Sequence, residues 1–306
     1  MFQLMTLLDG DHTTQDLQDS FAQVSGGSTI TAQQVSELIA SLDEALLLDS
    51  DLFREHKQKI EAAYRQEIRR PSALAGRSYP ESPDALRLLI DGFFQDDEGP
   101  RDTPRSQREV VALVAPHIDL GRGGPCFAWA YHALKGSEPA DVYVVLGTGH
   151  SSKSPFTTSR KIFETPFGDL PSDRAFVDRL VEAASQDLFA DELAHRNEHS
   201  IEFQAVFLKY LFPDREIAFV PILCGSFHES VERRQSPMED PAVADFVNAL
   251  RKAIDEDDRK ICIIAGVDFS HVGQRFGDTD SLSDDFISRI QGADRDLIAA
   301  ATQGDP

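Results

Sequence analysis

Short apolar runs rich in β-branched residues alternate with amphipathic stretches of helical length from residue 110 onward, and this alternation limits the possible fold more than any other feature. Four runs have the length of buried strands: residues 110–114, 142–146, 217–222 and 261–265. Strands that are apolar throughout are typical of sheets covered on both faces. We therefore expect an α/β fold in which helices cover the sheet.

Polar residues follow three of these four runs directly. The first run leads into His117, the second into residues 147–149 and then His150, and the fourth into Asp268 and His271. In open α/β sheets, ligands bind at the carboxyl ends of the strands. We therefore expect these side chains, which are far apart in the sequence, to approach one another at one edge of the sheet.

Several of these residues are of the types that bind metal ions. Neutral imidazole is the commonest protein ligand for zinc, iron and copper, and one ion needs several donors within about 2 Å. A single histidine at a turn more often caps or packs than binds a metal, so the indication comes from the group. The candidate metal ligands all follow strands: His117, His150, His271 and Asp268.

A further histidine, His199, opens a predicted helix over residues 199–208. Glu202 lies three residues on, which places it on the same helical face. We interpret His199 as a pocket acid or base and include Glu202 as a second candidate catalytic residue. Glu202 is also able to ligate a metal or to orient a histidine from this position.

A local motif supports a different function. Residues 195–199 match H-x-x-E-H, the inverzincin metallopeptidase pattern, in which two histidines face one zinc ion from a continuous helix. Here His195 and His199 would bind the ion and Glu198 would be the base. The polar residues around Asn197 are typical of a loop rather than of the middle of a helix. A zinc metallopeptidase is therefore the minor alternative.

The remaining histidines and the cysteines carry less information. Four histidines are assigned to the surface or to packing: His12, His56, His132 and His228. The three cysteines have no CxxC spacing, and two of them, Cys224 and Cys262, lie in apolar runs where a free cysteine behaves as a small hydrophobic residue. No disulfide framework is expected.

The formal charge of −22 is unusual for 306 residues. Such a charge repels nucleic-acid phosphates and anionic lipid headgroups, and no basic run is longer than the pairs at residues 69–70 and 233–234. We therefore expect no nucleic-acid partner and no membrane partner. The first residues lack the basic region of a signal peptide, and nowhere do 18 apolar residues run together, so a cytoplasmic location is expected.

The N-terminal part has its own helix signals. Thr13 or Thr14 can cap one helix, and Thr31 with Gln34 forms a capping box for a second. Residues 1–53 resemble the winged-helix-like, PqqD-type modules, which close with a short hairpin, here at residues 46–51. The acidic second helix argues against DNA and favours docking of a protein or peptide.

The rest of the chain is expected to begin after a connecting segment. Residues 54–69 predict a charged helix that ends before Pro71, because a proline disfavours helical geometry in the residue before it. Ser82 followed by Pro83 predicts the start of another helix. We therefore divide the chain into a module over residues 1–53, a connecting helix over 54–69 and a main domain over 70–306.

Six blocks in the main domain carry a family resemblance, and their order is part of it. They are RPSALAGRSYP at 70–80, APH at 115–117, LGTGH at 146–150, EHSIE at 198–202, PIL at 221–223 and DFSHVGQRF at 268–276. In this order they resemble the Memo family over residues 70–306. The added N-terminal module resembles the bacterial branch, the AmmeMemoRadiSam system B proteins. The chain stops after a helix where the family continues, so we expect the domain to be truncated at its C-terminal end.

The resemblance implies a fold shared with class III extradiol dioxygenases, which are non-haem iron enzymes, and a metal pocket lined by histidines. His117 and His150 match the two family histidine ligands, and His199 matches a further pocket histidine. The third family ligand is a cysteine where this chain has Ser270. Without a thiolate, a carboxylate or another histidine is expected to complete the site: His271, Asp268 or Glu202. This favours iron(II), with zinc or copper as alternatives.

Two classes of function follow from the resemblance. One is a metal-binding protein. As an enzyme, such a protein would carry out non-haem-iron redox or dioxygenase-type chemistry on a small-molecule ligand. The other is a non-catalytic metal carrier or adaptor, whose N-terminal module docks a protein partner of the radical-SAM type.

Overall fold

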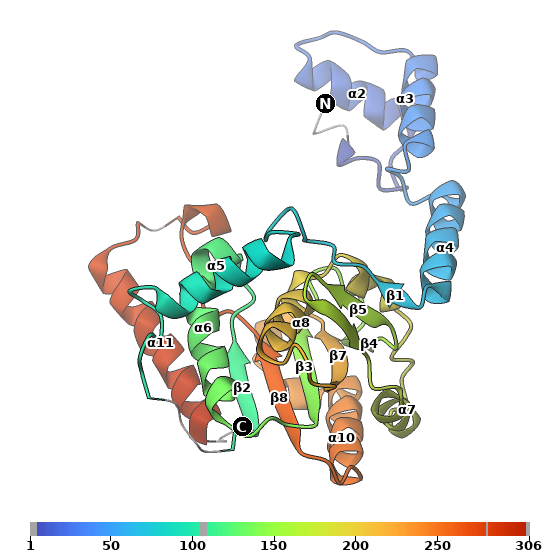
Figure 1. The fold of residues 1–306 in the computed structure, drawn as a ribbon. Helices are drawn as coiled ribbons and strands as arrows, with labels where there is room; N and C mark the ends of the chain where they lie inside the picture. Colours follow the sequence, from blue (N-terminus) through green and yellow to red (C-terminus); the bar gives the residue numbers. More distant parts are fainter. Residues whose placement is uncertain (1–4, 105–108, 280, 304–306) are drawn as a thin grey trace. The chain divides into compact units, whose positions relative to one another are not determined.

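The computed structural model describes residues 5–104, 109–279 and 281–303 (Figure 1). The chain divides into two compact units, Met1–Gln66 and Glu67–Pro306. The helix that we expected as a connector spans Asp51–Gln66 as α4 and groups with the first unit. Across the described ranges, no helix combines the length and the apolar character needed to cross a membrane.

From residue 13 onward the first unit is built by three helices: α2 (Thr14–Val24), α3 (Ala32–Glu44) and α4 (Asp51–Gln66). Thr13 caps α2, and Thr31 caps α3 in a capping box that Gln34 completes, as the sequence predicts. Leu17 and Val35 are buried where α2 and α3 pack together. The unit therefore has a small apolar core of its own.

The hairpin expected at residues 46–51 is not found. Leu46 has a φ of 60°, so it turns the chain in the left-handed region after α3, and Leu47 is 63% exposed. The described residues 5–66 contain no strand that could pair with this segment. Without a partner strand these leucines form a turn. The expectation that the first unit closes with a winged-helix-like hairpin is therefore wrong.

The second unit is built on a five-stranded sheet. Its strands, in spatial order, are β2 (Ala112–Ala115), β8 (Ile261–Gly266), β3 (Val142–Thr148), β7 (Ala218–Cys224) and β4 (Phe156–Thr158). The first four are parallel, and they coincide with the four apolar runs within a few residues. Only β4 runs antiparallel, at the edge beside β7. The predicted α/β class is confirmed.

Helices cover both faces of this sheet, and the alternation along β3 shows how. Tyr143 and Val145 point into one apolar core, and Val142 and Val144 point into another. The first core is covered by α5 (Pro83–Gln95), α6 (Leu120–Gly136) and α8 (His199–Leu211). The second is covered by α7 (Arg174–Ala183) and α10 (Pro241–Asp255). Strands β3 and β7 are buried at nearly every position, which requires apolar residues on both faces, whereas the edge strand β2 is largely exposed.

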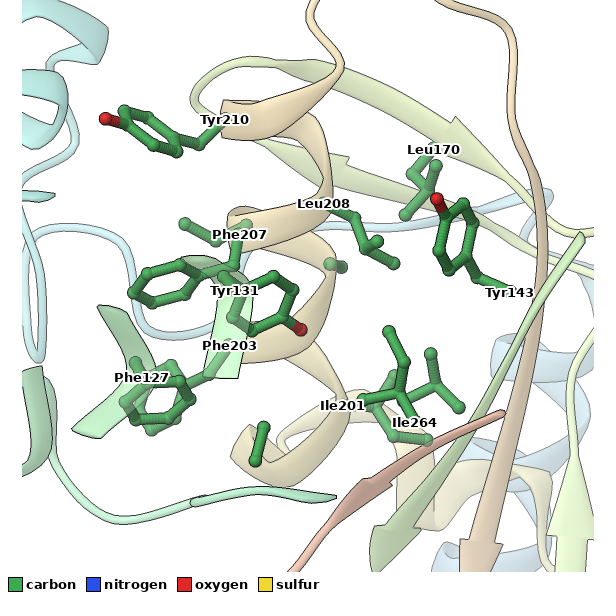
Figure 2. Packing of buried hydrophobic residues seen from close by; sticks show 14 of the residues in the cluster. Phe127, Tyr131, Tyr143, Leu170, Ile201, Phe203, Phe207, Leu208, Tyr210 and Ile264 are labelled. Carbon is green, nitrogen blue, oxygen red and sulfur yellow. The ribbon is translucent and has the colours of Figure 1, made fainter. Parts of the chain in front are cut away.

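Aromatic rings of α6 and α8 fill the first core. Figure 2 shows Phe127 and Tyr131 beside Phe207. The ring of Phe207 stacks on Phe127 at 4.9 Å and on Tyr131 at 4.8 Å between centroids. Every residue of α8 from position 200 to position 210 is buried. Helix α8 is therefore a central element, and the chain around its first turn is held firmly.

The other elements are smaller. A three-stranded sheet contains β1 (Arg69–Arg70), β5 (Ile162–Thr165) and β6 (Gly168–Pro171). The remaining helical elements are η1 (Glu192–Arg196), α9 (His228–Arg233), η2 (Pro237–Glu239), η3 (Gln274–Phe276) and α11 (Asp284–Gln303). Strand β1 matters for the site, because it places Arg70 against the chain that leads into α8.

Candidate metal centre

The first turns of α8 are joined to the carboxyl ends of two strands. Ser200 donates from its hydroxyl to the carbonyl of Thr148 at 2.8 Å, at the end of β3. Gln204 donates from its amide nitrogen to the carbonyl of Pro116 at 2.9 Å, just after β2. A Cβ on Gly147 would lie 2.5 Å from Ile201, so the close approach of α8 requires glycine there. These contacts bring the residues after β2 and β3 to the start of α8.

A second tie joins β8 to β2. The carboxylate of Asp268, just after β8, accepts a hydrogen bond from the backbone nitrogen of His117 at 2.8 Å. This hydrogen bond holds the backbone of His117, whose imidazole lies beside that of His150 just after β3. Its side chain is only 8% exposed.

Three histidines meet at this edge of the sheet. One nitrogen from each of His117, His150 and His199 lies within 4.8 Å of the other two. The ring centroids are 5.1 Å apart for His117 and His150, and 4.5 Å apart for His150 and His199. Among the described residues, this is the one group of three or more His, Cys, Asp or Glu side chains that could hold a metal ion. We call these three residues the histidine cluster.

The cluster is closed on one side and open on the other. His117 is buried, the side chain of His199 is 33% exposed and that of His150 is 47% exposed. Burial lowers the pKa of His117, and its two histidine neighbours add to this effect, while Asp268 partly opposes it. The hydrogen bond to Glu198 raises the pKa of His150. Because His150 is the most exposed of the three, a small molecule could approach the cluster from its side.

Glu198 holds two of the three imidazoles. Its carboxylate lies 3.0 Å from Nδ1 of His150 and 3.1 Å from Nδ1 of His199. It also accepts from the backbone nitrogens of His150, His199 and Ser200. Burial opposes ionisation of this carboxyl, but the hydrogen bonds from His150, His199 and the backbone outweigh it and hold the pKa of Glu198 far below its usual range.

The structure places the other expected ligands at the margin. Asp268 lies 3.8 Å from Nδ1 of His117 and 3.7 Å from Nε2 of His271. His271 is half exposed and packs against Phe276, outside the histidine cluster. Ser270 is exposed and donates from its hydroxyl to Asp294 at 2.7 Å. The described arrangement therefore puts His199 where His271, Asp268 or Glu202 was expected.

Glu202 is occupied elsewhere. It is 1% exposed and forms an ion pair with Arg70, which is fully buried. It also accepts from the backbone nitrogens of Ala73 and Leu74, each at 2.9 Å, and from the hydroxyl of Tyr79. We call these five residues the Arg70 network. All the polar contacts of Glu202 lie in this network, so the structure does not bring Glu202 into the histidine cluster.

The Arg70 network also supports the chain that leads into α8. The guanidinium of Arg70 donates to the carbonyl of His195 at 2.9 Å and to the carbonyl of Glu198 at 2.8 Å. Two fixed carbonyls on either side of Asn197 hold the turn that presents Glu198 and His199. Sequence reasoning did not assign this role to Arg70.

The H-x-x-E-H motif does not form a continuous helix. Its first histidine ends up in η1, which stops at Arg196, and its second histidine opens α8. His195 is 1% exposed, and its Nε2 lies 3.3 Å from the carbonyl of Thr157. Burial lowers the pKa of His195 to about 3. His195 therefore lies outside the cluster, and the arrangement of the metallopeptidase pattern is absent from these residues.

The donor set fits a divalent metal ion. Nδ1 of His117 is buried and has no hydrogen-bond partner, which is uncommon for a polar atom in a folded interior. Zinc and iron(II) are bound by imidazole at about 2.0–2.1 Å. Nitrogens within 4.8 Å of one another can all reach one ion after small side-chain rotations. Three protein ligands would leave further coordination positions open.

Glu198 is the main feature of the cluster that the sequence analysis missed. It appeared there only as the base of the peptidase alternative. The signal was its position, since Glu198 is the N-cap of α8 and N-caps are usually Ser, Thr, Asp or Asn. A glutamate at this place points to a further task for the carboxylate.

Comparisons with known proteins identify the family of this chain. The family described as Memo-like protein matches residues 70–306. A MEMO1 family protein of Aquifex aeolicus is 33% identical over 280 residues, which are 91% of this chain and 68% of the relative. MEMO1 family proteins of Methanopyrus kandleri and Saccharolobus solfataricus are 32% and 30% identical, over 67% of this chain and 69% and 70% of the relatives. The chain belongs to the Memo family.

Proposed function

We propose that this chain binds a divalent metal ion through His117, His150 and His199. The observation that supports the proposal is the convergence of three imidazole nitrogens from two strand ends and one helix start. Iron(II) is favoured over copper(I), because imidazole and carboxylate groups suit iron and zinc while thiolates favour copper(I). Asp268, 3.8 Å from Nδ1 of His117, is a carboxylate that could complete or adjust the site.

The proposed chemistry is redox or dioxygenase-type conversion of a small molecule. A bound iron(II) ion with open coordination positions would supply oxygen-dependent chemistry. The chain's own residues would then have separate tasks. Glu198 would hold His150 and His199 in place, and His117 would be shielded from water by its burial. The alternative assignment of His199, whose side chain is 33% exposed, is to hold a proton near a substrate instead of binding the metal ion.

Metal analysis of protein purified without oxygen tests this proposal. We expect about one equivalent of iron or zinc in the unaltered chain and loss of binding in His117→Ala and His150→Ala. His199→Ala separates two assignments, because a ligand role predicts a large loss of affinity and an acid or base role predicts retained metal. His271→Ala and His228→Ala are matched controls, since both side chains lie outside the cluster. Metal retained after loss of both His117 and His150 would contradict the proposal.

A non-catalytic metal carrier or adaptor is the second candidate, and a feature of the first unit favours it. A cavity of about 520 Å³ there is lined by apolar and by polar or charged side chains in similar numbers. Its lining includes Leu7, Leu8, Leu17, Ile39 and Leu47, with Asp9 and Arg54. Such a cavity fits an amphipathic segment of a protein partner, which the family resemblance suggests is of the radical-SAM type.

Oxygen uptake separates the two candidates. An enzyme loaded with iron(II) should consume oxygen with at least one catechol-type substrate, and a carrier should instead transfer its metal to an acceptor protein or chelator. The adaptor also predicts that Leu47→Glu weakens binding of a partner without changing metal content, because Leu47 lines the cavity of the first unit. Unchanged partner binding in Leu47→Glu would count against the adaptor.

A further inference from the structure

The carboxylate of Glu198 already accepts several hydrogen bonds. Its Oε1 lies within hydrogen-bond distance of Nδ1 of His150 and His199 and of the backbone nitrogens of His199 and Ser200, at 2.8–3.1 Å. Its Oε2 accepts from the backbone nitrogen of His150 at 2.9 Å. A carboxylate has about four lone-pair sites. With about two of these sites on each oxygen, the four donors leave Oε1, the oxygen that faces both imidazoles, without capacity to bind a metal ion as well.

The same contacts decide which imidazole nitrogens are free. An ionised carboxylate only accepts hydrogen bonds, so an imidazole nitrogen that faces it has to carry the proton. Glu198 faces Nδ1 of His150 and Nδ1 of His199. In a neutral imidazole with the proton on Nδ1, the lone pair is on Nε2.

We propose that Glu198 is a positioning residue that fixes His150 and His199 as Nδ1–H tautomers, so that both histidines bind the metal ion through Nε2. This inference rests on the proposed metal-binding function and names the ligand atoms of the site. A shared carboxylate couples the two imidazoles, because a displacement of Glu198 changes both ligands at once. Metal-binding histidines commonly donate their second ring nitrogen to a carboxylate, and loss of that carboxylate lowers metal affinity about ten-fold to a hundred-fold.

The position of Glu198 is itself fixed from two directions. Its backbone carbonyl accepts from the guanidinium of Arg70 at 2.8 Å, and its side chain caps α8, which is buried along most of its length. The carboxylate is 3% exposed, so water does not compete for its lone pairs. The orientation of both imidazoles therefore depends on a group that the fold holds in one place.

Imidazole nitrogen NMR of the metal-free full chain tests the tautomers directly. Long-range proton–nitrogen spectra at alkaline pH distinguish a protonated ring nitrogen from one with a free lone pair. We expect the Nδ1–H pattern for His150 and His199 in the unaltered chain, with signals assigned through His150→Gln and His199→Gln. The Nε2–H pattern for either residue would overturn the inference, whether or not the chain binds metal. This measurement needs no variant of Glu198 that folds.

Zinc affinity of Glu198→Gln provides the second test, with zinc chosen as a probe that has no redox chemistry. The amide group can no longer accept from both imidazoles and the backbone together, so we expect affinity to fall about ten-fold or more. Glu192→Gln is the matched control, because Glu192 is also buried and accepts from Ser159 at 2.7 Å but lies outside the histidine cluster. The control should bind zinc within about two-fold of the unaltered chain.

The outcomes separate the inference from the proposed function. No zinc binding by the unaltered chain would overturn the proposed function. Zinc binding by the unaltered chain that is equally tight in Glu198→Gln would leave the proposed function standing and overturn the positioning role. A fall in affinity confined to Glu198→Gln, together with loss of the Nδ1–H pattern in that variant, supports both.

Discussion

The Arg70 network and the histidine cluster both meet the first turns of α8, but they differ in how fully their polar atoms are paired. In the Arg70 network, each carboxylate oxygen of Glu202 accepts two hydrogen bonds, and Arg70 contacts three further backbone carbonyls. In the histidine cluster, Nδ1 of His117 is buried without a partner. Buried polar groups that are fully paired make a rigid scaffold, whereas the unpaired Nδ1 of His117, beside two further imidazoles, is a group that a bound ligand would satisfy.

Two glutamates four residues apart show the same contrast. Glu202 faces a guanidinium, a phenol and two backbone nitrogens, so its role is within the fold. Glu198 faces two imidazoles whose other nitrogens remain available. Glu202 thus serves the stability of the fold, and Glu198 orients two side chains of the candidate metal site.

Loss of Arg70 is expected to have the largest effect. Arg70→Met leaves Glu202 as a buried charge without its partner, and removal of one member of a buried ion pair costs about 3–5 kcal/mol of unfolding free energy. Equilibrium unfolding in urea measures this change. Arg69→Met is the matched control, because the adjacent Arg69 is 45% exposed and pairs with Glu164 at the surface. The control should lose less than about 1 kcal/mol.

An equal small loss in Arg70→Met and Arg69→Met would contradict the scaffold role. A double variant, Arg70→Met with Glu202→Gln, sharpens the test. It removes both charges, so it should be more stable than Arg70→Met alone if the cost arises from an unpaired carboxylate.

Tyr79→Phe is expected to have the next largest effect. The hydroxyl of Tyr79 donates to the buried carboxylate of Glu202, and a hydrogen bond to a charged group contributes about 1.5–3 kcal/mol. Burial, together with the negative charge of Glu202, raises the pKa of Tyr79, so the hydroxyl keeps its proton at neutral pH. Tyr210→Phe is the control, because the partner of Tyr210 is the exposed Asp91. Urea unfolding that shows a larger loss for Tyr210→Phe would reverse the expected order.

His195 makes the free energy of unfolding depend on pH. Its pKa is lowered to about 3 by burial, whereas an unfolded histidine titrates near 6.5. The unfolded state therefore takes up a proton first as pH falls, so stability is full above pH 6.5 and declines toward pH 3. Between pH 8 and pH 5 the decline from this residue is about 2 kcal/mol.

His195→Phe should remove this part of the decline, because phenylalanine does not titrate and keeps a ring beside Phe163. The measurement is the difference in urea midpoint between pH 8 and pH 5 for each chain. His228→Phe, at an exposed position of α9, should leave the difference as it is in the unaltered chain. An identical pH response in His195→Phe and the unaltered chain would show that His195 does not stay neutral.

The strands of the five-stranded sheet could be predicted well from the sequence, but the buried polar contacts could not. Apolar runs identify β2, β3, β7 and β8, and in β3 and β7 the reason is burial on both faces, which demands apolar residues at nearly every position. His117 and His150 were placed at one sheet edge because each follows a strand. Arg70 could not be recognised as buried, since a charged residue next to another arginine is usually exposed and its partner Glu202 is 132 positions away. The same distance hides the contacts of Glu202, which periodicity alone put on the face of His199.

Residue 270 tests the boundary of the histidine cluster, and here the smallest effect is expected. The family resemblance places a cysteine ligand at this position, whereas the hydroxyl of Ser270 is exposed and bonded to Asp294 on α11. Thiolate is a strong ligand for soft metals, so Ser270→Cys would raise copper(I) and zinc affinity sharply if residue 270 faced the imidazoles. Residue 270 faces Asp294 instead, so we expect the zinc affinity of Ser270→Cys to lie within about two-fold of that of the unaltered chain. Asp294→Ala, which frees the hydroxyl without adding a ligand, is the companion variant. A large gain in Ser270→Cys would mean that the loop after β8 can bring residue 270 to His117, and that the cluster of three histidines is one part of a larger site.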